Sequence, residues 1–298
     1  MPSARSNGID LVYEERGEGE PLVLIAGIGM QLVAWPDTLL DKLAARGFRV
    51  IVFDNRDVGL STKLEAAGLP RIRSMLARRL IGLPVQAPYT LFDMAADVAG
   101  LLDALDIARA HVVGASLGGM VAQAMAAAHG DRLTSLVSMM SQSAGRIFFT
   151  GNPLVGMRLL RAPARSRAEA VTQQVDFFRA AGSTAFFRDE VALAERAGRA
   201  YDRCFYPVGF ARQLAAVLAT GDMRARLASV RVPTLVLHGT SDGIFREACG
   251  RETAAAIPGA TFRLIKGWGH DLAEGATDLI VDAIVEHAST ARPSKRTA

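Results

Sequence analysis

Residues 114–118, Gly-Ala-Ser-Leu-Gly, constrain the fold of this 298-residue chain more than any other segment. The apolar run His-Val-Val at 111–113 precedes them, and small helix-forming residues follow at 120–128. Gly-x-Ser-x-Gly in that context predicts a strand, a sharp turn and a helix, with the serine at the corner. The amino end of the helix lies behind such a serine and favours negative charge, so Ser116 is a candidate nucleophile.

The pentapeptide alone is weak evidence for a nucleophilic serine. With 15 serines and 28 glycines in the chain, roughly 0.13 chance matches are expected. A nucleophilic serine also needs a base, an acid and donors for a developing negative charge, in a fold that brings them together. The rest of the sequence has to supply these partners.

Apolar strands and helices alternate along most of the chain. Continuously apolar strands separated by helices favour a mostly parallel sheet that is covered on both faces. We predict strands at residues 9–13, 21–26, 48–53, 110–114, 133–140, 232–237 and 261–265. The helices between them are expected at 35–45, 90–105, 120–128, 245–257 and 277–287.

Two stretches interrupt this alternation. Residues 62–89 indicate a basic, partly helical excursion. Residues 141–227 contain no convincing strand, and helical periodicity dominates at 157–160, 168–181, 190–199 and 210–219. We therefore expect a core domain formed by residues 1–140 and 228–298, with an inserted helical cap at 141–227.

Composition excludes several classes of protein. No apolar stretch reaches the roughly 18 residues of a membrane span, and nothing resembles a nucleic-acid-binding module. The first residues lack the apolar segment of a signal peptide, which predicts a cytoplasmic protein. Cys204 and Cys249 lie far apart and indicate structural thiols rather than a metal site.

The net charge of +4 is small beside 34 basic and 30 acidic residues, yet two basic clusters stand out. They would attract an acidic substrate or an anionic surface, or else form a solvated helix face. The clusters are Arg71, Arg73, Arg78 and Arg79, and then Arg158, Arg161, Arg165 and Arg167.

The serine elbow, the split parallel sheet and the order of the motifs resemble the α/β-hydrolase fold, in its serine esterase branch. The resemblance covers nearly the whole chain outside the cap. It implies a mostly parallel eight-stranded sheet flanked by helices, an inserted helical cap, and a triad in the chain order nucleophile, acid, base. Position 116 is a serine, which argues against the relatives that open epoxides or displace halide with an aspartate.

His270 is the expected base. It lies after the last predicted strand, on a loop whose flanking glycines allow a bend over the sheet edge. His111 begins the strand before the elbow, at the wrong end, and His129 lies in the last turn of the helix after it. His238 precedes the acid, and His287 lies in the final helix.

Asp242 is the expected acid, because it follows the strand at 232–237, where the family places this residue. Its role is to orient the imidazole and stabilise its protonated form. Asp271 is poorly placed to reach back to the neighbouring ring and is expected to hold its own loop. Asp222 precedes the strand, and the alternative family position, at residues 139–141, offers no carboxylate.

The resemblance assigns the oxyanion-hole donors to the backbone N–H groups of Leu117 and Ile28. The usual His-Gly start of the loop that carries Ile28 is Ala26-Gly27 here, so the sequence does not reveal what braces this loop. Residues 54–57, Asp-Asn-Arg-Asp, resemble a family turn and are expected to act as a hydrogen-bonded brace.

The substrate pocket is expected beneath the cap. Met30, Trp268 and Ile244 are candidate lining residues, and Gln31 is another. Apolar cap residues would either roof the pocket or pack the cap's own core. They are Phe148, Phe149, Leu154, Phe177, Phe178, Phe186, Phe187 and Phe205.

These features predict a serine hydrolase that cleaves a small, apolar carboxylic ester through an acyl-enzyme, with no metal or organic cofactor. Residues 27–31 and 54–57 most resemble bacterial methylesterases and enol-lactonases. One alternative uses the same triad for carbon–carbon or amide hydrolysis or for perhydrolysis. Another alternative is a ligand-binding protein with little turnover.

Overall fold

The central sheet has the strand order β1-β2-β4-β3-β5-β6-β7-β8 in the computed structural model, which describes residues 1–143 and 151–291. The first three neighbours, β1, β2 and β4, pair antiparallel, and every later pairing is parallel. This confirms the predicted α/β class with a mostly parallel eight-stranded sheet. The strands are β1 (Ser3–Ser6), β2 (Ile9–Arg16), β3 (Glu20–Ile25), β4 (Phe48–Phe53), β5 (Ala110–Ala115), β6 (Leu133–Met139), β7 (Thr234–Gly239) and β8 (Thr261–Ile265).

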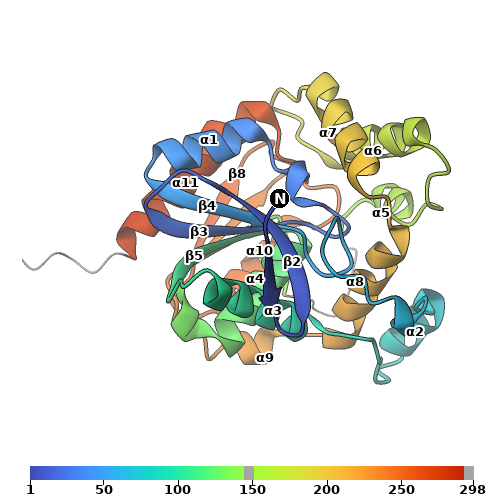
Figure 1. Ribbon diagram of the computed structural model, residues 1–298, viewed down its shortest axis with the longest axis horizontal. Helices are drawn as coiled ribbons and strands as arrows, with labels where there is room; N and C mark the ends of the chain where they lie inside the picture. The colour runs from blue at the N-terminus through green and yellow to red at the C-terminus, as the bar shows by residue number, and fades with distance from the viewer. Residues whose placement is uncertain (144–150, 292–298) are drawn as a thin grey trace, which may run out of the picture.

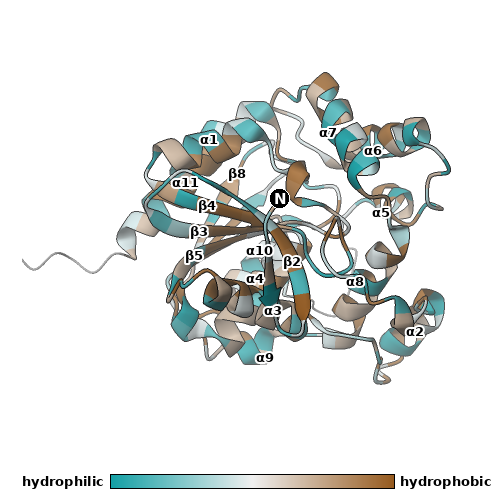
Figure 2. Cartoon of the chain, viewed as in Figure 1, coloured by the Kyte–Doolittle hydropathy of each residue, from teal (hydrophilic) through white to brown (hydrophobic). Residues whose placement is uncertain are grey.

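Helices cover both faces of the sheet because its central strands are apolar on both sides (Figures 1 and 2). One face packs against α1 (Asp37–Ala45) and α11 (Thr277–Thr290). The other packs against α3 (Leu91–Ala104), α4 (Leu117–Ala128) and α10 (Glu247–Ala256). The core therefore consists of two apolar layers, with the sheet between them.

The start of the chain differs from the prediction. β1, with the sequence Ser-Ala-Arg-Ser, was not predicted because it is a short, polar edge strand with little hydrophobic signal. The helix expected from residue 35 begins at Asp37, after the 3-10 turn η1 (Leu32–Ala34). Pro36 holds an extended conformation and caps that helix.

Four helices between β6 and β7 form a group beside the sheet domain (Figure 1). They are α5 (Pro153–Leu159), α6 (Arg167–Ala181), α7 (Glu190–Arg203) and α8 (Pro207–Thr220). The short α9 (Arg224–Leu227) then contacts α4 and α10 of the core. The predicted cap limits, 141–227, stay a prediction, and Phe148, Phe149 and the tail beyond residue 291 lie outside the described residues.

The excursion between β4 and α3 joins this group. It contains η2 (Glu65–Ala67) and α2 (Ile72–Leu80), and α2 packs against α8. The two remaining 3-10 turns are η3 (Gly130–Arg132) and η4 (Glu274–Ala276). None of the helices in the described part of the chain is long and apolar enough to cross a membrane.

Buried ion pairs attach α7 and α8 to the loop after β4. Arg203 donates to Asp54 at 2.6 Å, and Arg212 donates to Asp57 at 2.7 Å, with both carboxylates inaccessible to solvent. Asp54 also accepts backbone hydrogen bonds from Leu32 and Leu60. The segment at 54–57 therefore has the bracing geometry expected from the sequence, and it braces the cap as well as its own loop.

Candidate active site

Ser116 occupies a strained corner between β5 and α4. Its backbone has φ 55° and ψ −117°, in a region that residues other than glycine rarely adopt. Two glycines make this turn possible: a Cβ on Gly114 would lie 2.1 Å from the carbonyl oxygen of Gly118, and a Cβ on Gly118 would lie 1.9 Å from that of Ile25. The tight turn places Ser116 in the lining of a cavity beneath the helices between β6 and β7.

His270 links the other two predicted triad residues. Its Nε2 lies 2.9 Å from Ser116 Oγ, and its Nδ1 lies 2.9 Å from Asp242 Oδ2. The side chains come from the loops after β8, β5 and β7, and neighbouring parallel strands bring their carboxyl ends to one sheet edge. The three candidates form one continuous hydrogen-bonded chain.

The Asp242 carboxylate is fully buried and held from two sides. Its Oδ1 accepts hydrogen bonds of 2.8 Å from the backbone N–H groups of Ile244 and Phe245. The Phe245 ring also packs edge-on against the His270 imidazole, with 5.5 Å between ring centroids. These contacts stabilise the carboxylate charge and hold the ring in one orientation.

A second histidine lies beside Asp242. His238 is fully buried at the end of β7, and its Nε2 lies 3.0 Å from the carbonyl of Phe245 and 3.6 Å from Asp242 Oδ2. Burial lowers the pKa of His238, although the Asp242 charge opposes that effect. A neutral His238 leaves the Asp242 charge available to His270.

The other histidines lie away from Ser116. His111 contacts Ser135 and Glu20 near the start of β5. His129 is the residue at which α4 ends, and His287 on α11 contacts the carbonyl of Pro233.

The end of α6 holds the loops that carry the base and the acid. The Ala181 carbonyl accepts hydrogen bonds from the backbone N–H groups of His270, at 2.8 Å, and Gly243, at 3.2 Å. Ser183 Oγ accepts a bond from Gly269 N and donates one to Asp271. The end of α6 thus fixes the two loops that carry the candidate base and the candidate acid.

Asp271 does not hold its own loop in the way the sequence suggested. Its carboxylate binds the cap instead, accepting bonds from Ser183 and a 2.9 Å bond from Arg188. The sequence could not indicate this role, because Ser183 and Arg188 are more than 80 positions away.

Ile28 and Leu117, the expected oxyanion donors, both line the cavity that contains Ser116. Leu117 is the first residue of α4, so its N–H has no acceptor within the helix. Beside Ile28, Gly29 N donates a 2.8 Å bond to Oε1 of Gln213, a buried residue of α8. Gln213 also donates a bond to the Arg56 carbonyl.

Gln213 is a site residue that sequence reasoning missed. It braces the loop whose usual histidine is replaced by Ala26. No motif marks it, and 184 positions separate it from Gly29. The available signal is a polar side chain at the start of an otherwise apolar helical run, residues 214–218.

The cavity around Ser116 has a volume of about 940 Å³. Of the predicted lining residues, Met30, Gln31 and Ile244 line it, as do Phe177, Phe178 and Phe205 of the cap. Leu154, Phe186 and Phe187 are not among its lining residues, and Leu154 and Phe187 are exposed to solvent.

The prediction that Trp268 lines the pocket is wrong. Trp268 is completely buried in the apolar layer under α1 and α11, and its indole N–H donates to the Asp271 carbonyl. The glycine-flanked loop directs the indole into the core. From there the indole supports the loop that carries His270 through its hydrogen bond to Asp271.

The sequence pattern of the α/β hydrolase fold matches residues 20–276. The chain belongs to this family. Rhodomycin D methylesterase DauP of Streptomyces sp. (strain C5) is 28% identical over 321 residues, covering 98% of this chain and 99% of that protein. A 2-hydroxy-6-oxononadienedioate/2-hydroxy-6-oxononatrienedioate hydrolase of Burkholderia vietnamiensis (strain G4 / LMG 22486) is 29% identical, covering 87% and 83%.

A solved structure is similar to this chain in fold as well as in sequence. The enol-lactonase from Burkholderia xenovorans LB400 superposes with a TM-score of 0.73 at 26% identity, covering 97% of this chain and 100% of that one. The family match and these relatives support hydrolase activity for the present α/β hydrolase.

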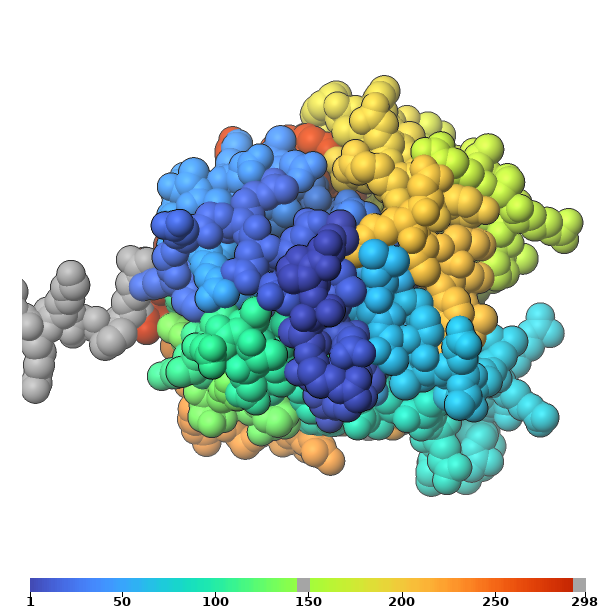
Figure 3. Space-filling view, viewed as in Figure 1, coloured from blue at the N-terminus to red at the C-terminus, as the bar shows by residue number. Residues whose placement is uncertain are grey.

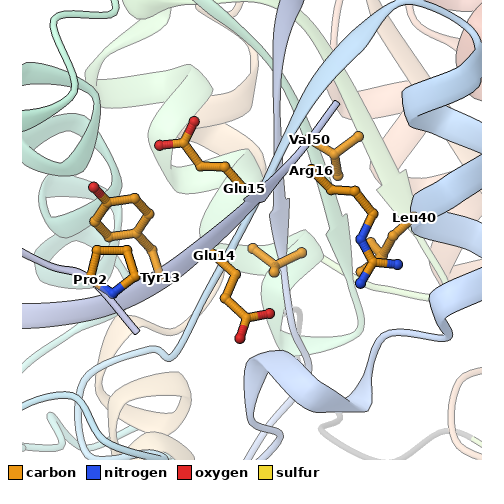
Figure 4. A pocket seen from close by; sticks show the side chains of 8 residues that line it. Pro2, Tyr13, Glu14, Glu15, Arg16, Leu40 and Val50 are labelled. Atoms are coloured by element: carbon orange, nitrogen blue, oxygen red, sulfur yellow. The ribbon is translucent and has the colours of Figure 1, made fainter. Parts of the chain in front are cut away.

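A second hollow of about 330 Å³ lies along β2 in this hydrolase (Figure 4). Its lining includes Tyr13, Glu14, Glu15 and Arg16, and no serine, cysteine or histidine. Among the described residues, no group of three or more histidine, cysteine or carboxylate side chains could hold a metal ion. The cavity at Ser116 is therefore the candidate active site.

Proposed function

We propose that this α/β hydrolase cleaves carboxylic esters through an acyl-enzyme on Ser116. The observation that carries the proposal is the hydrogen-bonded chain from Ser116 through His270 to Asp242, with 2.9 Å at each link. A serine hydroxyl is a weak nucleophile until a base within hydrogen-bond reach takes its proton.

Each residue has a step in the reaction. His270 Nε2 accepts the Ser116 proton as Oγ attacks the acyl carbon, and the buried Asp242 carboxylate stabilises the resulting imidazolium. The oxyanion accepts hydrogen bonds from the N–H groups of Leu117 and Ile28. His270 then protonates the departing alkoxide, and a water molecule activated by the same histidine releases the acid.

The cavity supports an ester with a large, apolar acid or alcohol part. Its volume of about 940 Å³ is at the upper end of ordinary ligand pockets. Aromatic and aliphatic side chains such as Phe177, Phe178 and Ile244 line it. One relative that matches almost the full chain is named a methylesterase, which favours a methyl ester of a bulky acid as the first substrate class to test.

The test is turnover of p-nitrophenyl esters of increasing acyl length and of a methyl ester of a polycyclic aromatic acid. We expect Ser116→Ala to reduce kcat by at least about a thousandfold with the fold retained. Ser289→Ala, on the exposed end of α11, is the matched control and should leave kcat unchanged. Retained turnover in the Ser116 variant would refute the acyl-enzyme.

The same panel, extended with an amide and with a substrate that has a cleavable carbon–carbon bond, separates the other hypotheses. If the wild-type protein turns over no ester but binds a small apolar ligand tightly, it is a ligand-binding protein. If it cleaves amides or carbon–carbon bonds in preference to esters, and Ser116→Ala abolishes that activity, the same three residues catalyse the hydrolysis of a different bond.

A further inference from the structure

The positive charge of this protein is concentrated in two segments that are distant in sequence. Residues 62–89 and 151–167 together contain nine basic residues and one acidic residue, a net charge of +8. The whole chain carries +4, so the remainder carries −4. The charge is therefore strongly polarised.

Both segments line the cavity that contains Ser116. The first contributes Leu69, Ile72 and Arg73, and the second contributes Arg158 and Leu160. Leu69 and Leu160 are exposed to solvent as well, so the cavity reaches the surface beside these segments. In Figure 1, α2 and α5 lie at the same edge of the molecule, on either side of α8.

The two basic segments also expose apolar side chains. Five of these side chains are more than 60% exposed, although leucine, isoleucine and methionine are usually buried. They are Leu69, Leu80 and Ile81 around α2, and Leu154 and Met157 on α5. Figure 3 shows the α2 segment, in cyan, projecting from the body of the protein at the lower right.

Most of the arginines between these apolar residues are not neutralised. In the described part of the chain, Arg71, Arg73, Arg78, Arg158 and Arg165 make no salt bridge. Arg161 has only a 3.9 Å contact with Asp176, and Arg167 pairs with Asp202. Exposed leucines interleaved with unpaired arginines are typical of helices that lie in the interface of an anionic lipid layer.

We propose that this basic apolar rim, formed by residues 69–83 and 154–165, docks the protein on an anionic lipid surface, with the Ser116 cavity facing the lipid. Leucine and isoleucine side chains would enter the boundary between headgroups and acyl chains, while the arginines bind lipid phosphates. A second copy of the chain fits this rim poorly, because a symmetric contact would oppose two strongly positive surfaces.

The proposal extends the proposed function by giving the source of the substrate. An apolar ester dissolved in the lipid would reach Ser116 without passing through water. The docking itself does not depend on catalysis, so it can be measured separately from turnover.

The experiment is co-sedimentation with vesicles of phosphatidylcholine alone, or with about one third phosphatidylglycerol. We expect wild-type protein and Ser116→Ala to bind the anionic vesicles equally, and roughly tenfold more strongly than neutral vesicles at low salt. Raising the salt concentration should weaken the binding, because exposed charges are screened.

Two double variants separate the apolar contribution to vesicle binding from the ionic contribution. Leu80→Ser with Ile81→Ser, and Arg71→Gln with Arg165→Gln, change residues that do not line the cavity. Each pair is expected to lower binding to anionic vesicles roughly tenfold and to leave turnover of a soluble ester unchanged. Val191→Ser and Arg251→Gln, exposed positions on α7 and α10, are the matched controls.

Equal binding to neutral and anionic vesicles, or unchanged binding by both double variants, would overturn the proposal. Sedimentation velocity provides a further check. A wild-type dimer that dissociates when Leu80 and Ile81 are replaced would show that the rim binds a second copy, which would also overturn lipid docking. Absence of ester turnover in the wild-type protein, with its binding to anionic vesicles intact, would instead refute the proposed function alone.

Discussion

Ser116 is held by contacts with three residues from two other parts of the chain. Its Oγ contacts His270, its carbonyl accepts a 2.7 Å bond from Ser141, and its backbone N–H binds the Met139 carbonyl. The strained backbone at Ser116 persists because these surrounding bonds hold it in place. Held in this way, the proposed nucleophile is pre-organised for attack.

Gln213 gives a prediction at this scale. Gln213→Leu removes the acceptor for Gly29 N and displaces the loop that carries the Ile28 donor. We expect kcat to fall roughly ten- to a hundredfold with little change in KM, because the oxyanion forms only in the transition state. The measurement is steady-state kinetics on a p-nitrophenyl ester.

Gln213→Glu is the matched variant, since its carboxylate keeps an acceptor for Gly29 N. It should recover a substantial part of the lost kcat. A Leu variant with normal kcat and raised KM, or a Glu variant as slow as the Leu variant, would show that Gln213 does not position the oxyanion loop. Thermal melting of both variants reports any loss of folded protein.

The elbow shows how elements constrain one another. β5, α4 and β3 approach so closely that the first turn of α4 has no room for a side chain at Gly118. This contact is backbone against backbone, so it cannot be relieved by a rotamer change.

We therefore expect Gly118→Ala to destabilise the protein by about 2–4 kcal/mol, because its Cβ would lie 1.9 Å from the Ile25 carbonyl oxygen. Gly130→Ala is the control, since the added Cβ would make an ordinary 3.6 Å contact with Val232. Urea unfolding measures both. Equal free energies of unfolding for the two variants would contradict the packing argument.

At the scale of the whole molecule, burial of histidines makes stability depend on pH. Desolvation lowers the pKa values of His238 and His287 below their ordinary value of 6.5. The unfolded chain therefore binds protons that the folded protein does not bind. The stability that the two neutral histidines contribute is fully present above about pH 7 and is lost as the pH drops through 6.5 toward their lowered pKa values.

We expect the free energy of unfolding to decrease between about pH 7.5 and 5.5, with a smaller decrease in His238→Gln, which removes one of the two groups. Urea titrations at several pH values measure this slope. An identical slope in wild type and variant would show that His238 does not contribute to the acid sensitivity.

Local patterns in the sequence predicted much of the fold and of the candidate site. Continuous apolar runs identified the central strands, and the helical period of apolar residues identified the helices between them. Both signals depend on neighbours within a few residues along the chain. Gly-x-Ser-x-Gly predicted the corner at Ser116. The resemblance to the family predicted that Asp242 and His270, each after its own strand, would meet Ser116. In the structure the three side chains do meet, because parallel strands end at one edge of the sheet.

Tertiary structure alone decided the remaining features. Gln213 bracing Gly29, Asp271 binding the cap, and Trp268 turning into the core depend on side-chain directions and on contacts between distant segments. The two basic segments meet at one cavity for the same reason, since they are also distant in sequence. Sequence patterns report spacing along the chain, whereas these contacts depend on how the cap packs onto the sheet domain in three dimensions.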